Sequence, residues 1–129
     1  MSREEQIKHW VKSAAEDWES ALILIKNKRF VQGLFLIHLS IEKLLKAKWQ
    51  VDNEGFPPKT HDLLFIQGQT DLELNEEQLA LLNTINTWNL EGRYTDYKNS
   101  FYKLATLGYV DKYFEDVENI RKCLLEELQ

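Results

Sequence analysis

The sequence predicts an all-α protein, an antiparallel up-and-down bundle of four long helices plus one short helix. Apolar residues recur at intervals of three and four along most of the 129 residues, which is the period of an amphipathic helix. No stretch alternates apolar and polar residues with the period of two that marks a strand. Residues 30–50 are apolar around nearly the whole circumference of a helix, so we expect the other helices to cover this stretch.

The first two predicted helices cover residues 2–27 and 30–50. Because the connection between them is very short, the two helices should pack antiparallel. Gly33 lies early in the second helix, where glycine costs about 1 kcal/mol relative to alanine. We interpret this glycine as a sign that a neighbouring backbone approaches closely.

A loop and a short helix should follow the central helix. Gly55 favours the left-handed geometry found beyond helix ends, and the pair Pro57-Pro58 lacks the amide donors that a helix requires. The short helix begins after an N-cap candidate at Thr60 or Asp62. It should end near Gly68.

The remainder of the chain should form two more long helices. Asn75 and Gln78 fit a capping box, so a third long helix should begin there and run to about Leu90. Residues 93–107 contain three tyrosines and a phenylalanine but no clear apolar period. We therefore expect an ordered loop, or a loop with one irregular turn. The last helix should begin at residues 106–108, and its solvent-facing side is strongly acidic.

Length and composition predict a single domain, residues 1–129, in the cytoplasm. A chain of this size buries about two thirds of its unfolded surface without staples. The lone Cys123 forms no intramolecular disulfide, and no run of 18 apolar residues exists, so we expect no membrane segment. The net charge of −5 argues against broad, sequence-indifferent binding of nucleic acid, although a local basic patch stays open.

Metals, cofactors and nucleophilic catalysis leave no sequence signature. The three histidines lack the spacing of metal ligands, and the five glycines are scattered singly rather than grouped in a phosphate loop. No serine nucleophile motif occurs either. We therefore expect no metal and no cofactor.

Three polar residues of the central helix, His38, Glu42 and Lys46, recur every four residues and form a polar ridge. Two interpretations stay open. Lys43 and Lys46 could contact a phosphate, with Glu42 and His38 tuning them. Alternatively the residues form a buried polar network, in which Asp17 of the first helix pairs with Lys43 or Lys46.

His61 and Asp62 lie at a predicted helix start, where free amides favour an anion, although such a pair more often caps the helix. Arg93 is followed by tyrosines; a guanidinium binds phosphate and aromatic rings stack on bases. Alternatively the rings close one end of the bundle, and Arg93 pairs with a carboxylate such as Glu42 or Asp17. The candidate nucleotide or RNA contacts are Arg93, Tyr94, Tyr97, Lys98, Lys43 and Lys46, and the candidate polar network comprises Asp17, His38, Glu42 and His61.

Three motifs in this order resemble the HEPN (higher eukaryotes and prokaryotes nucleotide-binding) family. They are His38-x3-Glu42-Lys43-x2-Lys46-Ala47, Thr60-His61-Asp62-Leu63 and Arg93-Tyr94. The resemblance implies an antiparallel helical bundle, commonly a homodimer, and a role in nucleotide or nucleic-acid biology. Numerous bacterial members resemble toxin partners of small nucleotidyltransferases.

Ribonuclease members of the family carry an arginine followed, after four to six residues, by a histidine. Here the corresponding positions are Lys98, Asn99 and Ser100, and no histidine follows His61. Cleavage without a metal needs a group that moves a proton near neutral pH, which histidine does and lysine usually does not. We therefore expect no ribonuclease activity of that kind.

The resemblance and the missing histidine together predict a non-catalytic HEPN-type module. We expect it to be dimeric and to bind a nucleotide, RNA or a partner protein. One alternative is a divergent ribonuclease toxin of a toxin–antitoxin pair that uses Arg93, Tyr94, Tyr97 and Lys98. Another is a non-catalytic partner of a small nucleotidyltransferase.

Overall fold

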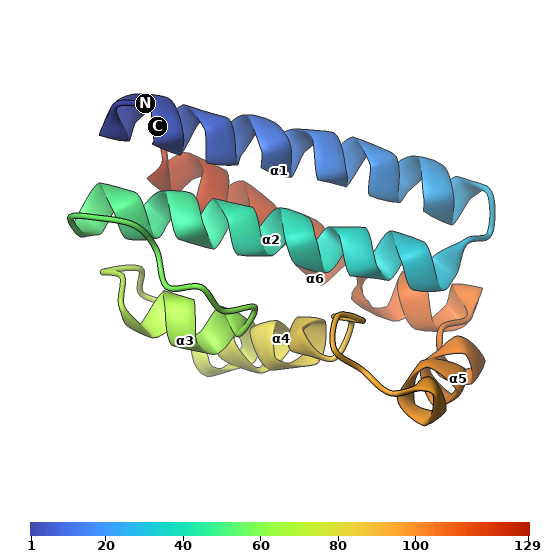
Figure 1. Cartoon of the computed structure of the whole chain (residues 1–129). Coiled ribbons are helices and arrows are strands. Elements are labelled where there is room, and N and C mark those ends of the chain that lie inside the picture. The colour runs from blue at the N-terminus through green and yellow to red at the C-terminus, as the bar shows by residue number, and fades with distance from the viewer.

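The computed structural model describes residues 1–129 and contains six helices and no strand (Figure 1). The helices are α1 (Arg3–Lys26), α2 (Phe30–Asp52), α3 (Leu63–Gly68), α4 (Glu76–Asn86), α5 (Thr95–Leu104) and α6 (Leu107–Glu127). The predicted all-α class is confirmed. The number of helices differs from the expected five, because part of the stretch predicted as a loop forms α5. None of the six is both long enough and apolar enough to cross a membrane.

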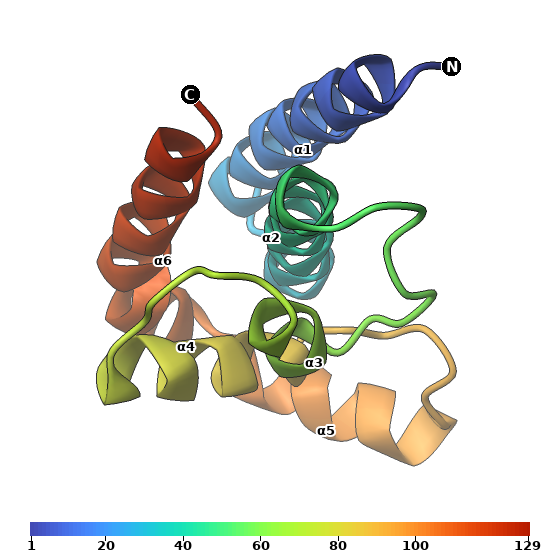
Figure 2. The ribbon, with the colours of Figure 1, turned by 90° about the vertical axis from the view of Figure 1, so that its left-hand side faces the viewer.

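The central helix of the prediction is α2. Figure 2 shows α2 nearly end-on, with α1, α3 and α6 arranged around it. Of its 23 residues 14 are buried, and six of these are polar or charged. The buried polar residues are His38, Ser40, Glu42, Lys46, Lys48 and Gln50. Such groups are expensive to bury without partners, so their partners determine how α2 is held.

α1 and α2 form an antiparallel hairpin (Figure 1). The close approach predicted at Gly33 is present: a Cβ atom there would lie 2.6 Å from Ile25 Cγ1 and 3.3 Å from the carbonyl oxygen of Ala21. The two helices therefore approach each other where α2 has no side chain.

The turn between α1 and α2 is a Schellman motif with a lysine at the position that glycine normally occupies. The Arg29 N–H donates to the Leu24 carbonyl at 2.8 Å, and the Lys28 N–H donates to the Ile25 carbonyl at 3.0 Å. Lys28 has a φ of +62°, in the left-handed region, and it is the one residue other than glycine with positive φ. The turn thus contains a residue whose backbone conformation is unfavourable for an L side chain.

The predicted caps of the shorter helices are largely confirmed. Asp62 is the N-cap of α3, and its carboxylate accepts from the N–H groups of Leu64 and Phe65. Asn75 and Gln78 form the expected capping box at the start of α4. α4 ends at Asn86, four residues before the expected end.

The early end of α4 has a structural reason in the next residues. Thr87 Oγ1 donates to the Thr84 carbonyl at 2.6 Å and closes the last turn. Trp88 then leaves the helix and is completely buried, and its indole N–H donates to the Tyr109 hydroxyl of α6 at 2.9 Å. Burial of a tryptophan with a satisfied N–H outweighs one further helical turn.

The expectation of a loop at residues 93–107 is wrong, because residues 95–104 form α5. The helix buries a single residue, Phe101, and Tyr97 stacks on that ring with centroids 6.3 Å apart. Its N-cap, Tyr94, makes no side-chain capping bond. A helix with so little buried surface and no polar cap carries a weak sequence signal.

Lys48 connects the end of α2 to two distant parts of the chain. Its ammonium lies 3.0 Å from Asp52 of the same helix, 2.6 Å from Asp71 in the loop before α4, and 3.7 Å from Glu127 of α6. Burial lowers the pKa of Lys48, but hydrogen bonds to Asp71 and Asp52 more than offset this, so the pKa is raised. The ammonium therefore stays charged and holds three segments together.

Candidate functional site

The polar ridge of α2 has partners on both sides of the helix. On the α1 side, Lys43 Nζ lies 2.6 Å from Asp17 and donates to Ser13 Oγ at 2.7 Å. Of the two predicted pairings for Asp17, the one with Lys43 is present. Lys46 instead pairs with Glu42 at 2.9 Å, one turn earlier in the same helix.

Glu42 connects α2 to the loop that precedes α3. Its second carboxylate oxygen lies 2.8 Å from His61 Nδ1. The other ring nitrogen of His61 lies 2.8 Å from Glu91, which follows α4. Both contacts are hydrogen bonds when each ring nitrogen carries a proton, which is the positively charged form of histidine. The imidazole is thus held between two carboxylates from different segments.

His38 lies behind this arrangement and is completely buried. Its Nε2 is 3.1 Å from the His61 carbonyl oxygen, an acceptor, so Nε2 carries the proton. Nδ1 then bears a lone pair, and this atom has no hydrogen-bond partner. Burial lowers the pKa of His38, and the charge of Glu42 opposes this only in part. His38 therefore remains neutral and fixes the position of the His61 backbone.

A polar pocket of about 310 Å³, open to solvent, lies between the loop before α3 and the end of α4. We call it the His61–Arg93 pocket. It contains no apolar residue, and its lining comprises Thr60, His61, Asp62, Asn86, Asn89 and Arg93. A pocket of this composition suits a small charged or strongly polar group rather than an apolar ligand.

Two polar side chains of the pocket are already used by the fold. Asp62 caps α3 and accepts from Asn86 Nδ2 at 2.9 Å. Asn86 Oδ1 in turn accepts the Leu63 N–H at 2.9 Å. These bonds fix the geometry of the pocket wall. They also occupy much of the hydrogen-bond acceptor capacity of the Asp62 carboxylate.

Arg93 differs from these residues because it is exposed and forms no ion pair. Its Nε donates to the Asn89 carbonyl at 3.2 Å, and its guanidinium carbon lies 4.3 Å from the centre of the Tyr97 ring. The alternative expectation that Arg93 pairs with Glu42 or Asp17 is therefore wrong, since those carboxylates pair with other cations. The terminal nitrogens of the guanidinium are free to bind a ligand.

The structure brings together only part of the predicted contact set. Lys43 and Lys46 lie in ion pairs of α2 and do not line the pocket. Tyr97 lies against the Arg93 guanidinium, which packs over the face of its ring, and does not line the pocket. Tyr94, the N-cap of α5 with 87% of its surface exposed, and Lys98 of α5 are exposed and do not line the pocket.

Three residues of the pocket were not identified by the sequence as site residues, Thr60, Asn86 and Asn89. Thr60 was expected only as a cap, and Asn89 lies where the third long helix was expected to continue. The repeated asparagines near the end of that helix, at 83, 86 and 89, were the available signal. Asparagine is common where a helix ends and its backbone groups need partners.

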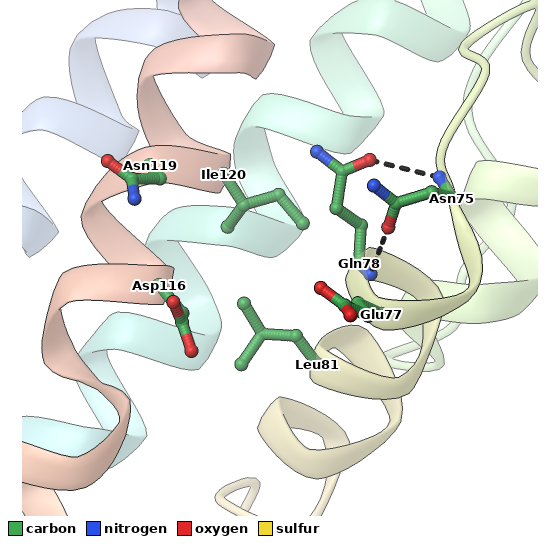
Figure 3. A pocket seen from close by; sticks show the side chains of 7 residues that line it. All are labelled: Asn75, Glu77, Gln78, Leu81, Asp116, Asn119 and Ile120. Carbon is green, nitrogen blue, oxygen red and sulfur yellow. Dashed lines mark hydrogen bonds between the residues drawn. The ribbon is translucent and has the colours of Figure 1, made fainter.

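A second hollow, of about 200 Å³, lies between α4 and α6 (Figure 3). The side-chain oxygens of Asn75 and Gln78 accept the two backbone N–H bonds of the capping box, which the dashed lines in Figure 3 mark. The ionised groups at this hollow are the carboxylates of Glu77 and Asp116. Because these charges would repel a phosphate, the His61–Arg93 pocket is the better candidate for an anionic ligand.

The fold and the pocket define a small helical-bundle domain with a guanidinium open to ligand. The family model of the HEPN domain matches residues 7–128, nearly the whole chain. The chain therefore belongs to the HEPN domain family, as the three sequence motifs predicted. No curated protein and no solved structure matches the chain.

Proposed function

We propose that this chain is a HEPN module that binds the phosphate of a nucleotide or of RNA in the His61–Arg93 pocket without cleaving it. The observation that carries the proposal is the free guanidinium of Arg93 in a polar, open pocket. A guanidinium presents parallel N–H groups that match two phosphate oxygens. The stacking of Arg93 on Tyr97 fixes the plane of this donor fork.

Arg93 is the one lining residue of the pocket with a cation that has no carboxylate partner, which supports an anionic ligand. Both ring nitrogens of His61 contact carboxylates, those of Glu42 and Glu91, at 2.8 Å. Asp62 is occupied by the cap of α3 and by Asn86. A phosphate would therefore be bound by the Arg93 guanidinium, because the carboxylates of Asp62, Glu42 and Glu91 already have partners.

The contacts of His61 argue against catalysis. A general base must present a ring nitrogen with a free lone pair to the proton that it removes. Both nitrogens of His61 instead face carboxylate oxygens at 2.8 Å. In this arrangement the imidazole has no free position for proton transfer.

The test is binding of a fluorescent mononucleotide to the wild type and to Arg93→Ala, measured by anisotropy. Hydrogen bonds to charged groups contribute about 1.5–3 kcal/mol, so the variant should bind about tenfold more weakly or worse. Arg93→Lys keeps the charge but loses the fork and should be intermediate. Lys122→Ala, which removes an exposed cation of α6, is the matched control. Equal affinities of the wild type and Arg93→Ala would refute the proposal.

A second candidate function is RNA cleavage, and one observation favours it. His61 and Arg93 line the same pocket although they are far apart in sequence, so His61 could replace the histidine absent after Arg93 if its ring were released from Glu42 or Glu91. Purified protein and His61→Ala should be incubated with a mixed RNA pool. Degradation by the wild type alone would favour cleavage, whereas intact RNA in both samples would leave binding as the function.

We further propose that the module is a homodimer, as the family resemblance implies. Leu104 and Leu107, at the corner between α5 and α6, have 54% and 56% of their surface exposed. Exposed apolar side chains close together favour an interface. Light scattering coupled to size exclusion should give twice the monomer mass for the wild type and a monomer for Leu107→Lys. A wild-type monomer at tens of micromolar would exclude the dimer.

A further inference from the structure

A separate cavity of about 340 Å³ lies at the turn between α1 and α2, and Tyr102 of α5 is among the residues that line it. We call it the α1–α2 turn cavity. Lys28 and Arg29 line it, no carboxylate does, and neither cation forms an ion pair or a side-chain hydrogen bond. In a protein with a net charge of −5, this is a local concentration of unneutralised positive charge.

Tyr102 of α5 forms one wall of this cavity. Its hydroxyl accepts a hydrogen bond from Gln32 Nε2 at 2.6 Å, which fixes the ring relative to α2. The ring nevertheless keeps 55% of its surface exposed. A tyrosine ring that is held by its hydroxyl and open on its face is suited to stack on a planar base.

α5 connects this cavity with the His61–Arg93 pocket. Tyr94, Lys98 and Tyr102 are spaced four residues apart and so form one row along the helix, and all three are exposed. The row begins beside Arg93 and ends at the α1–α2 turn cavity. At 1.5 Å per residue it extends about 12 Å along the axis of α5. The Lys98 ammonium lies between the two tyrosines along it, so a cation for a phosphate is flanked by rings that can stack on bases.

We propose that the α1–α2 turn cavity and this row of α5 bind single-stranded RNA. The inference rests on the proposed phosphate site at Arg93 and specifies its ligand as a polynucleotide rather than a mononucleotide. Lys28 and Arg29 contact phosphates, and Tyr94 and Tyr102 stack on bases. The bases must be unpaired, because in a duplex the faces of the bases stack on one another and are not accessible to tyrosine rings. Contacts of this kind tolerate many sequences.

Lys28 allows binding to be tested without loss of folding. Its positive φ suits glycine better than lysine, so Lys28→Gly removes the ammonium and relieves the backbone at the same time. Arg29 makes no side-chain capping bond to α2, so Arg29→Gln removes the second charge and no bond of the fold. The matched control is Lys8→Ala/Lys12→Ala, which removes two exposed charges from α1.

The experiment measures anisotropy with two labelled ligands, a mononucleotide and a single-stranded RNA of about eight nucleotides, a length within the site sizes of single-strand-binding folds. The wild type should bind the longer RNA at least tenfold more tightly. Lys28→Gly/Arg29→Gln should lose most of this advantage and bind the mononucleotide as the wild type does. Its salt dependence with the longer RNA should also fall, by about 1.4 in the slope of log K against log salt for two lost phosphate contacts.

The outcomes separate this inference from the proposed function. If Lys28→Gly/Arg29→Gln binds the longer RNA as tightly as Lys8→Ala/Lys12→Ala does, the α1–α2 turn cavity is not an RNA site. Binding of an RNA duplex as tight as that of the single strand would also overturn the inference. If Arg93→Ala keeps its mononucleotide affinity while Lys28→Gly/Arg29→Gln loses RNA, the phosphate site at Arg93 fails and the cavity stands. Absence of binding to either ligand would overturn both.

Discussion

At the scale of single residues, Lys28 is under backbone strain that a glycine would not have. The left-handed conformation costs an L residue about 1–2 kcal/mol. A glycine at this position avoids that cost but loses more conformational entropy on folding, so only part of it appears as added stability. Lys28→Gly should therefore raise the free energy of unfolding by up to about 1 kcal/mol, measured by urea titration. Lys26→Gly, two residues earlier at the last residue of α1, should lower it, by at most about 1 kcal/mol. The same sign for both variants would contradict the assignment of the Schellman motif.

His38 should make stability depend on pH. Burial lowers its pKa in the folded protein, whereas in the unfolded chain the pKa is about 6.5. Below that value the unfolded chain takes up a proton that the folded protein excludes. Unfolding should therefore become easier as the pH falls from about 6.5, by as much as about 1.4 kcal/mol per pH unit.

His38→Gln isolates this effect from the other groups nearby. Glutamine keeps an N–H donor for the His61 carbonyl but does not titrate. The charged neighbours Glu42, His61 and Glu91 remain in both proteins. Thermal melts between pH 8 and pH 5 should show a smaller loss of stability for His38→Gln than for the wild type, as the intrinsic histidine pKa of about 6.5 requires. If the wild type and His38→Gln lose the same stability as the pH falls, then His38 is protonated in the folded protein as easily as in the unfolded chain.

At the scale of elements, Gly33 sets how closely α1 and α2 pack. Its replacement by alanine would favour the helix by about 1 kcal/mol in isolation, but the new Cβ would lie 2.6 Å from Ile25 Cγ1. Overpacking of this kind typically costs about 1–3 kcal/mol, so Gly33→Ala should be destabilising. Gly68→Ala is the matched control, because a Cβ there meets nothing within 4 Å. If the two variants have equal stability, the helices can separate at little cost.

The elements that the sequence predicted well and those that it missed differ in what they bury. α1, α2 and α6 each bury a stripe of side chains, and their bounds agree with the expectation to within two residues. α5 buries Phe101 alone, and its exposed tyrosines obscured the spacing of Tyr97, Phe101 and Leu104. α4 ends early because of a single contact, between Trp88 and Tyr109, which links residues 21 positions apart. No local pattern predicts such a contact.

At the scale of the whole molecule, Lys48 joins α2, the loop before α4 and α6 through three carboxylates. Lys48→Met keeps the buried chain but leaves Asp52, which is mostly buried, without its cation. Because solvent screens Asp71 and Glu127 and the Asp71 N–H still donates to Asp52, urea unfolding of Lys48→Met should show a loss of about 1–3 kcal/mol, less than for a fully buried pair. Glu127→Gln removes the longest of the three contacts and should change stability far less. A small effect of Lys48→Met would indicate that packing alone holds the three segments.

Only some contacts of the candidate site could be predicted from the sequence, as was true of the helices. The pairing of Asp17 with Lys43 could be anticipated, because both lie on long helices whose faces are fixed by the apolar pattern. The meeting of His61 with Arg93 could not, because both lie in loops whose paths depend on the caps of α3 and the end of α4. Lys48 was missed altogether, since two of its three partners are remote in sequence.

Because α5 buries only Phe101, the rate at which this helix opens should differ from that of the other helices. A helix that buries one side chain opens locally at a small free energy, so its amide hydrogens should exchange with deuterium long before those of α2. RNA lying along α5 would stabilise the closed form and slow that exchange. The deuterium uptake of residues 95–104 should therefore report whether ligand is bound, without a label on either molecule.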